Sequence, residues 1–139
     1  MLPLKTILVP TDFSELSKKA VRYAEKMAHE SGAKLILLHV DPPLLSFADT
    51  PSDPTVHVER LKKQLHEIQP ANVNVEHRLA EGFAADVINQ TSRETSADLI
   101  VIATHGRTGM AQAFLGSVAQ SVLRGAHCPV LTINPLCPE

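Results

Sequence analysis

Short apolar runs alternate with longer amphipathic stretches along this chain. Residues 6–9 and 99–103 are almost wholly aliphatic, and residues 34–40 are apolar on both faces. Runs of this kind are typical of parallel strands that are covered on both sides. Val73 and Val75, in contrast, alternate with polar residues, which predicts a half-exposed strand nearer the edge of a sheet.

Between these runs, apolar residues recur every three or four positions, as they do in amphipathic helices. The first helix is expected to begin after Ser14, whose hydroxyl can cap it, and to end at Gly32. Further helical faces lie within residues 58–68, 84–91 and 116–124. The sequence therefore predicts four helices that separate the apolar runs.

A last apolar segment at residues 129–133 completes a βαβαβαβαβ pattern. This pattern predicts one α/β domain over residues 1–139, with an open, doubly wound, five-stranded parallel sheet and helices on both faces. Right-handed crossovers and central positions for the most apolar strands favour the order 3-2-1-4-5. In that order a crevice opens at the carboxyl ends of strands 1 and 4, where open sheets bind ligands.

Composition excludes several classes of partner. The 139 residues carry a net charge of −2, so no basic face for a nucleic acid is expected. No apolar run approaches the ~20 residues of a membrane-spanning helix, and the first residues do not resemble a secretory signal. The two cysteines make no disulfide framework. A cytoplasmic location without membrane contact is therefore the default expectation.

The segment Pro10-Thr11-Asp12 follows the first strand and falls at the predicted crevice. Two roles are open for Asp12: its carboxylate can accept hydrogen bonds from ribose hydroxyls, or it can help to start the following helix. Thr11 can cap a turn. Val40, at the end of the second strand, either offers backbone groups to the edge of a base or is an ordinary core residue.

A second segment at the crevice follows the fourth strand and carries two glycines. Gly106 and Gly109 allow positive φ angles and a close approach of the backbone to a ligand. His105 and Arg107 can add hydrogen bonds or charge. The same residues are also consistent with a surface turn and solvated charges.

The pair Gly116-Ser117 stands where the last helix is expected to begin. A helix N-terminus presents N–H groups and the positive end of the helix dipole, which suits a phosphate, and Ser117 can add a hydroxyl donor. The region matches neither the Walker-type loop nor the G-x-G-x-x-G of dinucleotide-binding proteins. Phosphate binding and a plain helix cap therefore both remain open.

Histidines outside the predicted crevice are not expected to act as catalysts. His39 lies inside an apolar strand, so it is expected to be a core histidine with satisfied hydrogen bonds. The other histidines on predicted helices and the outer strand show no metal-ligand spacing. Four of them are expected at the surface in contact with water: His29, His57, His66 and His77.

Several stretches resemble the universal stress protein family. Residues 7–14 are similar to its first strand and turn, residues 97–109 to its fourth strand and glycine loop, and residues 115–119 and 128–131 to its closing segments. The resemblance covers most of the chain and is weakest over residues 41–80. It implies a Rossmann-like fold of the adenine nucleotide alpha hydrolase type.

Family members that bind ATP carry a glycine, two residues, a second glycine, nine residues and then Gly-Ser or Gly-Thr. Here Gly106 precedes nine residues and Gly116-Ser117, but Ala103 replaces the first glycine. Its methyl group is not expected to abolish a site built from backbone groups. The resemblance implies ATP or AMP as the ligand, with Mg²⁺ held through the phosphates.

The resemblance also implies roles for individual residues. Asp12 would meet the ribose and Val40 the adenine. The phosphates would meet Gly106, Arg107, Gly116, Ser117 and Val118. The other residues expected around the nucleotide are Pro10, Thr11, Ala103, His105 and Gly109.

The last strand is predicted to lie at an edge of the sheet, which makes it a template for pairing. Family members are similar in this respect and dimerise through it, so a homodimer is expected. The alternative is a monomer in which Pro129 and the tail after residue 134 protect the edge. The strand residues concerned are Val130, Leu131, Thr132 and Ile133.

Three functions are consistent with these features. The sequence favours a regulatory protein of the stress response, in which binding of ATP or AMP acts as a switch. A slow ATPase or phosphotransferase is the second, although there is no Walker lysine and no evident general base near a γ-phosphate. Asp12 and His105 are the only nearby candidates for that role. The third is a dimeric interaction module that needs no nucleotide.

Overall fold

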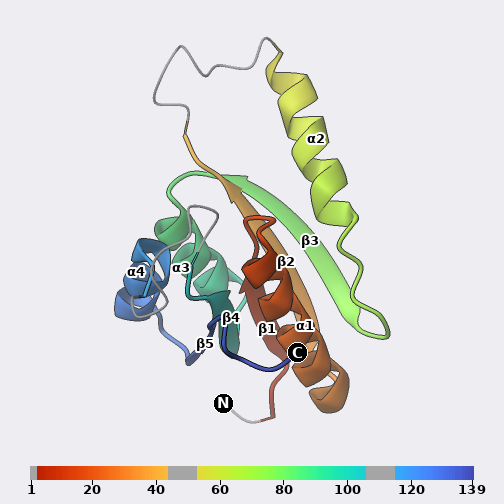
Figure 1. The fold of residues 1–139 in the computed structure, drawn as a ribbon, viewed down its shortest axis with the longest axis vertical. Coiled ribbons are helices and arrows are strands. Elements are labelled where there is room, and N and C mark those ends of the chain that lie inside the picture. Colours follow the sequence, from red (N-terminus) through yellow and green to blue (C-terminus); the bar gives the residue numbers. More distant parts are fainter. Residues whose placement is uncertain (1–2, 44–52, 106–114) are drawn as a thin grey trace.

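Strands and helices alternate along the part of the chain that the computed structural model describes, residues 3–43, 53–105 and 115–139. The strands are β1 Thr6–Pro10, β2 Lys34–Asp41, β3 Asn74–Glu81, β4 Leu99–Ala103 and β5 Val130–Ile133. The helices are α1 Glu15–Ser31, α2 Pro54–His66, α3 Ala84–Glu94 and α4 Ser117–Gly125 (Figure 1). The predicted alternation is therefore confirmed, with boundaries that differ by a few residues.

The strands form one parallel sheet in the order β3-β2-β1-β4-β5, as predicted. Ile7 of β1 lies opposite Leu35 of β2 on one side and Leu99 of β4 on the other. β3 and β5 occupy the two edges. Since β1 pairs with both β2 and β4, the chain reverses its direction of winding between β1 and β4.

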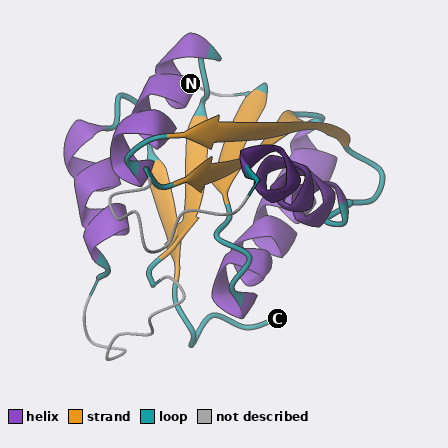
Figure 2. Cartoon of the chain, turned by 90° about the horizontal axis from the view of Figure 1, so that it is seen from above, coloured by secondary structure: helices purple, strands orange, loops and turns teal. Residues whose placement is uncertain are grey.

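The sheet separates two apolar clusters. Ile7 and Val9 of β1 face α1, and Leu65 of α2 belongs to the same cluster. Leu8, between them in the sequence, faces Ile88 of α3 and the helix α4. Successive side chains of a strand point to opposite faces, so aliphatic residues at every position bury both sides of β1. Figure 2 shows the resulting helices on both sides of the strands.

Local signals set the ends of α1. The Ser14 hydroxyl accepts a hydrogen bond from the Ser17 N–H, and Gly32 ends the helix with a φ of 75°. The left-handed conformation at Gly32 lets its N–H donate to the Ala28 carbonyl. Both predicted caps are confirmed. Among the described helices, none is long and apolar enough to cross a bilayer.

The histidines follow the predictions only in part. His39 is a buried core residue, as expected. The expectation of solvated side chains is wrong for His57, whose Nε2 lies 2.9 Å from Asp41 Oδ2, and for His77, whose Nε2 lies 2.8 Å from the Ile68 carbonyl oxygen. The reason is that α2 begins beside the end of β2, and the chain that follows α2 lies beside β3, so polar groups of different elements meet. Apolar periodicity does not detect such contacts.

Candidate functional site

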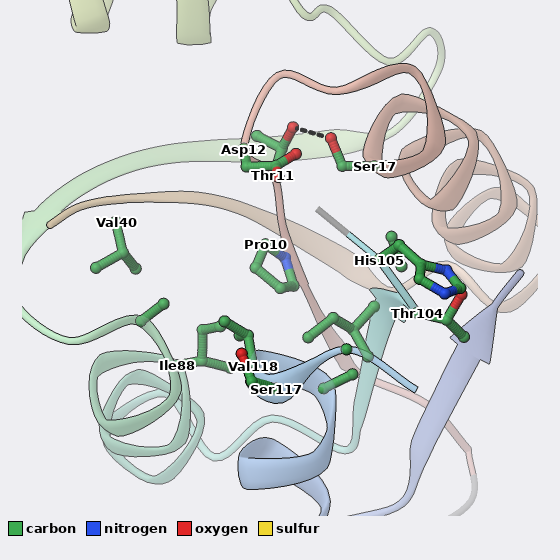
Figure 3. Close-up of a pocket in the computed structure, with 15 residues that line it drawn as sticks. Pro10, Thr11, Asp12, Ser17, Val40, Ile88, Thr104, His105, Ser117 and Val118 are labelled. Atoms are coloured by element: carbon green, nitrogen blue, oxygen red, sulfur yellow. Dashed lines mark hydrogen bonds between the residues drawn. The ribbon is translucent and has the colours of Figure 1, made fainter. Parts of the chain in front are cut away.

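A cavity of about 200 Å³ lies at the carboxyl ends of β1 and β4. Figure 3 shows Asp12 and Thr11 on one side of it and Ser117 and Val118 on the opposite side, with Pro10 between them. This is the point at which the direction of winding changes, where open α/β sheets bind ligands. The structure therefore places the cavity at the predicted crevice.

Most of the residues predicted for the site border this cavity. They are Pro10, Thr11, Asp12, Val40, Ala103, His105, Gly116, Ser117 and Val118. The other three, Gly106, Arg107 and Gly109, lie outside the described residues. Contact of any of them with a nucleotide stays a prediction.

The turn after β1 is held by hydrogen bonds between close neighbours. The Phe13 N–H donates to Thr11 Oγ1 at 3.1 Å, and the Ser14 N–H donates to Asp12 Oδ1 at 3.0 Å. The Thr11 hydroxyl also lies 2.8 Å from the Ser17 hydroxyl (Figure 3). Thr11 thus caps a turn, as predicted. Asp12 helps to start α1 and also borders the cavity, so its two suggested roles are compatible.

Phe13 occupies an unusual place in this turn. Its φ is 69°, in the left-handed region, which costs a residue with a side chain about 1–2 kcal/mol. Its ring packs against that of His39 in a tilted arrangement, with 4.3 Å between centroids. His39 Nδ1 lies 2.7 Å from the carbonyl oxygen of Thr11. Tertiary contacts therefore compensate for a strained backbone at the edge of the cavity.

The opposite side of the cavity depends on a close approach at Gly116. Its N–H donates to the Thr104 carbonyl oxygen at 2.7 Å. A Cβ atom at this position would lie only 2.6 Å from the same oxygen. The φ of Gly116 is −63°, which any residue can adopt. Glycine is thus required here because of space, not because of backbone conformation.

The end of β4 is fixed to its neighbours by buried polar groups. The Thr104 N–H donates to the Ile133 carbonyl oxygen at 3.0 Å, and Thr104 Oγ1 lies 2.8 Å from His105 Nδ1. Both side chains are buried. His105 borders the cavity, so these bonds hold its ring in place there.

The remaining wall of the cavity was not predicted. Figure 3 shows Ile88 on the side of the cavity away from His105, as is Val40. The sequence pattern assigns Ile88 to the buried face of a helix, and only the fold shows that this face reaches the cavity. The residues missed from the sequence are Ser17, Ala84, Ile88, Ile102, Thr104 and Ala119. The alanines and isoleucines among them, together with Val40, give the cavity a largely apolar lining, as is usual in small-molecule sites.

Comparison with known proteins identifies the family. The model of the universal stress protein family matches residues 3–134. The chain belongs to this family. Universal stress protein MJ0531 of Methanocaldococcus jannaschii is 32% identical, and the alignment covers 94% of this chain and 82% of that protein. Universal stress protein G of Escherichia coli O157:H7 is 34% identical, with coverage of 94% and 99%.

A solved universal stress protein in complex with cAMP has the same fold. It superposes with a TM-score of 0.74 at 28% identity, and the match covers 94% of this chain and 97% of that one. In the present chain, Ala103 of β4 pairs with Ile133 of β5 and borders the cavity. The methyl group that departs from the ATP-binding pattern therefore lies at the site itself.

Proposed function

We propose that this universal stress protein binds an adenine nucleotide, ATP or AMP, and acts as a regulatory binding switch of the stress response in the cytoplasm. The observation that carries the proposal is the cavity at the switch point, with Asp12 on one side and the start of α4 on the other. The relative solved with cAMP supports an adenine nucleotide as the class of ligand.

The apolar side of the cavity suits a purine. Val40 and Ile88 would contact the faces of the adenine ring, and backbone groups near Val40 would meet its edge. The Asp12 carboxylate would accept hydrogen bonds from the ribose hydroxyls, since ionised acceptors form the stronger bonds with hydroxyl donors. The ribose would then lie between the ends of β1 and β4.

The N-terminus of α4 would hold the phosphates. In α1 the cap residue Ser14 supplies its own hydroxyl as an acceptor, whereas the cap residue of α4 is Gly116, which has no side chain. The first turn of α4 also contains no acidic residue. A phosphate is the kind of anion that such a helix end accepts. By the family pattern Gly106, Arg107 and Gly109 would complete the site, and Mg²⁺ would enter with the phosphates of ATP.

Calorimetric titration with ATP and AMP, with and without Mg²⁺, tests this proposal after mass spectrometry has excluded nucleotide carried through purification. We expect binding in the wild type and at least ten-fold weaker binding in Ser117→Glu, because the added carboxylate repels a phosphate at this helix end. Ser121→Glu is the matched control, since Ser121 is an exposed serine one turn further along α4. No binding at millimolar nucleotide would contradict the proposal and favour a nucleotide-independent interaction module.

We also propose that two copies pair through β5. This strand forms an edge of the sheet, and Leu131 is 37% exposed. The tail after β5 runs to α1, where Tyr23 donates to the Pro138 carbonyl oxygen and Arg22 pairs with Glu139 (Figure 1). This course favours pairing over an edge protected by the tail. Sedimentation analysis should find a dimer in the wild type and in Leu136→Lys, but a monomer in Leu131→Lys.

A further inference from the structure

Two aromatic rings, those of Phe13 and His39, support the turn that carries Asp12. His39 belongs to β2 and is only 8% exposed. Phe13 follows Asp12 directly and borders the groove between α1 and α2, together with Val21 and Ile68. Neither His39 nor Phe13 is among the described residues that line the cavity. Any influence of these rings on a ligand there must pass through the turn itself.

His39 fixes the backbone at the start of the turn. The backbone N–H of Thr11 donates to the Leu38 carbonyl oxygen at 2.8 Å, and His39 Nδ1 lies 2.7 Å from the Thr11 carbonyl oxygen. A carbonyl oxygen can only accept, so Nδ1 carries the proton and donates it. Consecutive residues of β2 therefore hold both backbone polar groups of the residue that precedes Asp12.

The His39 ring also supports the residue after Asp12. Phe13 has a φ of 69°, which a bulky residue rarely adopts, and its ring lies 4.3 Å from the His39 ring at an interplanar angle of 31°. Strained backbone of this kind persists only where surrounding contacts determine it, and it is common at functional sites. One side chain thus constrains the turn on both sides of Asp12.

We propose that His39 is a positioning residue for the nucleotide site. Its Nδ1–H and its ring face hold Thr11 and Phe13, and thereby place the Asp12 carboxylate for the ribose hydroxyls. This inference rests on the proposed nucleotide function. It assigns part of the recognition of the ribose to His39, a residue that does not line the cavity and acts through Asp12.

Two variants separate the functions of the imidazole. His39→Phe keeps a ring that can stack on Phe13 but removes the donor, whereas His39→Asn keeps an N–H close to the position of Nδ1 but removes the ring. We expect His39→Phe to bind AMP about ten-fold more weakly, the usual effect of losing one such hydrogen bond. We expect His39→Asn to recover part of this affinity.

Ribose recognition provides a readout that a general loss of structure would not change. In His39→Phe the preference for AMP over 2′,3′-dideoxy-AMP should fall by the same factor as the affinity for AMP. In the Asp12→Asn background, His39→Phe should cause little further loss, because the pathway through Asp12 is already removed. The proposal would be overturned if His39→Phe lowered the affinities for AMP and 2′,3′-dideoxy-AMP equally. It would also be overturned if the losses of AMP affinity were additive in the double variant.

Amide hydrogen exchange in the ligand-free protein tests the same inference without a nucleotide. The N–H groups of Phe13 and Ser14 should exchange about ten-fold faster in His39→Phe, while that of Val101 in β4 should be unchanged. Unchanged exchange at Phe13 and Ser14 would refute the positioning role. If the wild type fails to bind AMP, the proposed function fails, and the exchange measurement alone decides whether His39 holds the turn.

Discussion

The two ends of the parallel sheet use polar groups in opposite ways. At the amino end, Asp98 Oδ2 accepts hydrogen bonds from the N–H groups of Lys5 and Thr6, at 2.8 and 3.0 Å. Nearby, Lys34 Nζ lies 2.7 Å from Glu76 Oε1 across β2 and β3. At the carboxyl end, polar groups such as Thr11 and Asp12 also have partners within the chain, but they border a cavity.

These differences have a physical consequence. The hydrogen bond from the Lys5 N–H is the main cause that lowers the pKa of Asp98, and the bond from Lys34 is the main cause that lowers that of Glu76. Neither carboxylate borders the cavity, so replacement of either is expected to change the free energy of unfolding. Replacements at the cavity should instead change the binding of a ligand. The two ends therefore allow stability and binding to be separated experimentally.

The largest effect is expected from Gly116→Ala. The new Cβ would lie 2.6 Å from the Thr104 carbonyl oxygen, so the start of α4 must move away from β4. Overpacking costs about 2 kcal/mol, and if the shift is taken up at the phosphate site, AMP binds about 30-fold more weakly. Calorimetry measures the affinity, and thermal unfolding confirms that the variant is folded.

Gly32→Ala is the matched control for this prediction. A Cβ at Gly32 has no heavy atom within 4 Å, but the φ of 75° disfavours alanine. It should lower the stability by about 1 kcal/mol and leave the affinity for AMP unchanged. Equal affinities of the two variants would show that the start of α4 plays no part in binding.

Asp12→Asn should have the next largest effect. The amide retains an oxygen that can accept from the Ser14 N–H, so the turn is preserved, but the negative charge facing the cavity is lost. We expect about ten-fold weaker binding of AMP, since hydrogen bonds to charged groups are worth about 1.5–3 kcal/mol. Titration with 2′,3′-dideoxy-AMP checks the cause, because this ligand should bind both proteins equally.

The sequence predicts the fold and one wall of the site well, because both depend on local signals. Apolar runs such as residues 34–40 report burial on both faces, and Gly32 reports a left-handed helix end. The strand ends then follow from the topology, which brings Asp12 and Ser117 to one cavity. These features require no knowledge of which side chains meet across the sheet.

The features that the sequence does not predict all arise from tertiary contacts. Gly116 is required by its distance to Thr104, twelve positions earlier in the chain, and no local pattern reveals such an approach. His57 contacts Asp41 only because α2 lies beside the end of β2. The strain at Phe13, in the turn after β1, is likewise compensated by His39 of β2. The periodicity of apolar residues describes one element at a time, so it does not predict contacts between residues of different elements.

Ser14→Ala should lower the stability of the protein without changing its ligand site. The hydroxyl of Ser14 accepts from the Ser17 N–H at 3.2 Å and caps α1. Loss of such a cap costs about 1 kcal/mol, measured as a lower midpoint of denaturation. The control is Ser31→Ala, which removes an exposed hydroxyl near the other end of α1 and should have a smaller effect. A large loss of AMP affinity in Ser14→Ala would mean that the cap supports the ligand site as well.

The smallest effect concerns Asp98 and depends on pH. Because the pKa of Asp98 is lower in the folded protein than its usual 3.8, its contribution to stability is present above that value and is lost as the pH falls through the folded pKa. Asp98→Asn should therefore be less stable than the wild type at pH 7, and this difference should shrink as the pH is lowered below about 4. Asp98 is half-buried and partly screened by water, so the difference should be smaller than that of Ser14→Ala.

Denaturant unfolding from pH 7 to pH 3 measures this difference in stability between Asp98→Asn and the wild type, while the AMP affinity at pH 7 should not change. A constant difference across this range would mean that the carboxylate charge is not what holds the start of β1, and the contrast between the two ends of the sheet would then depend on the cavity alone.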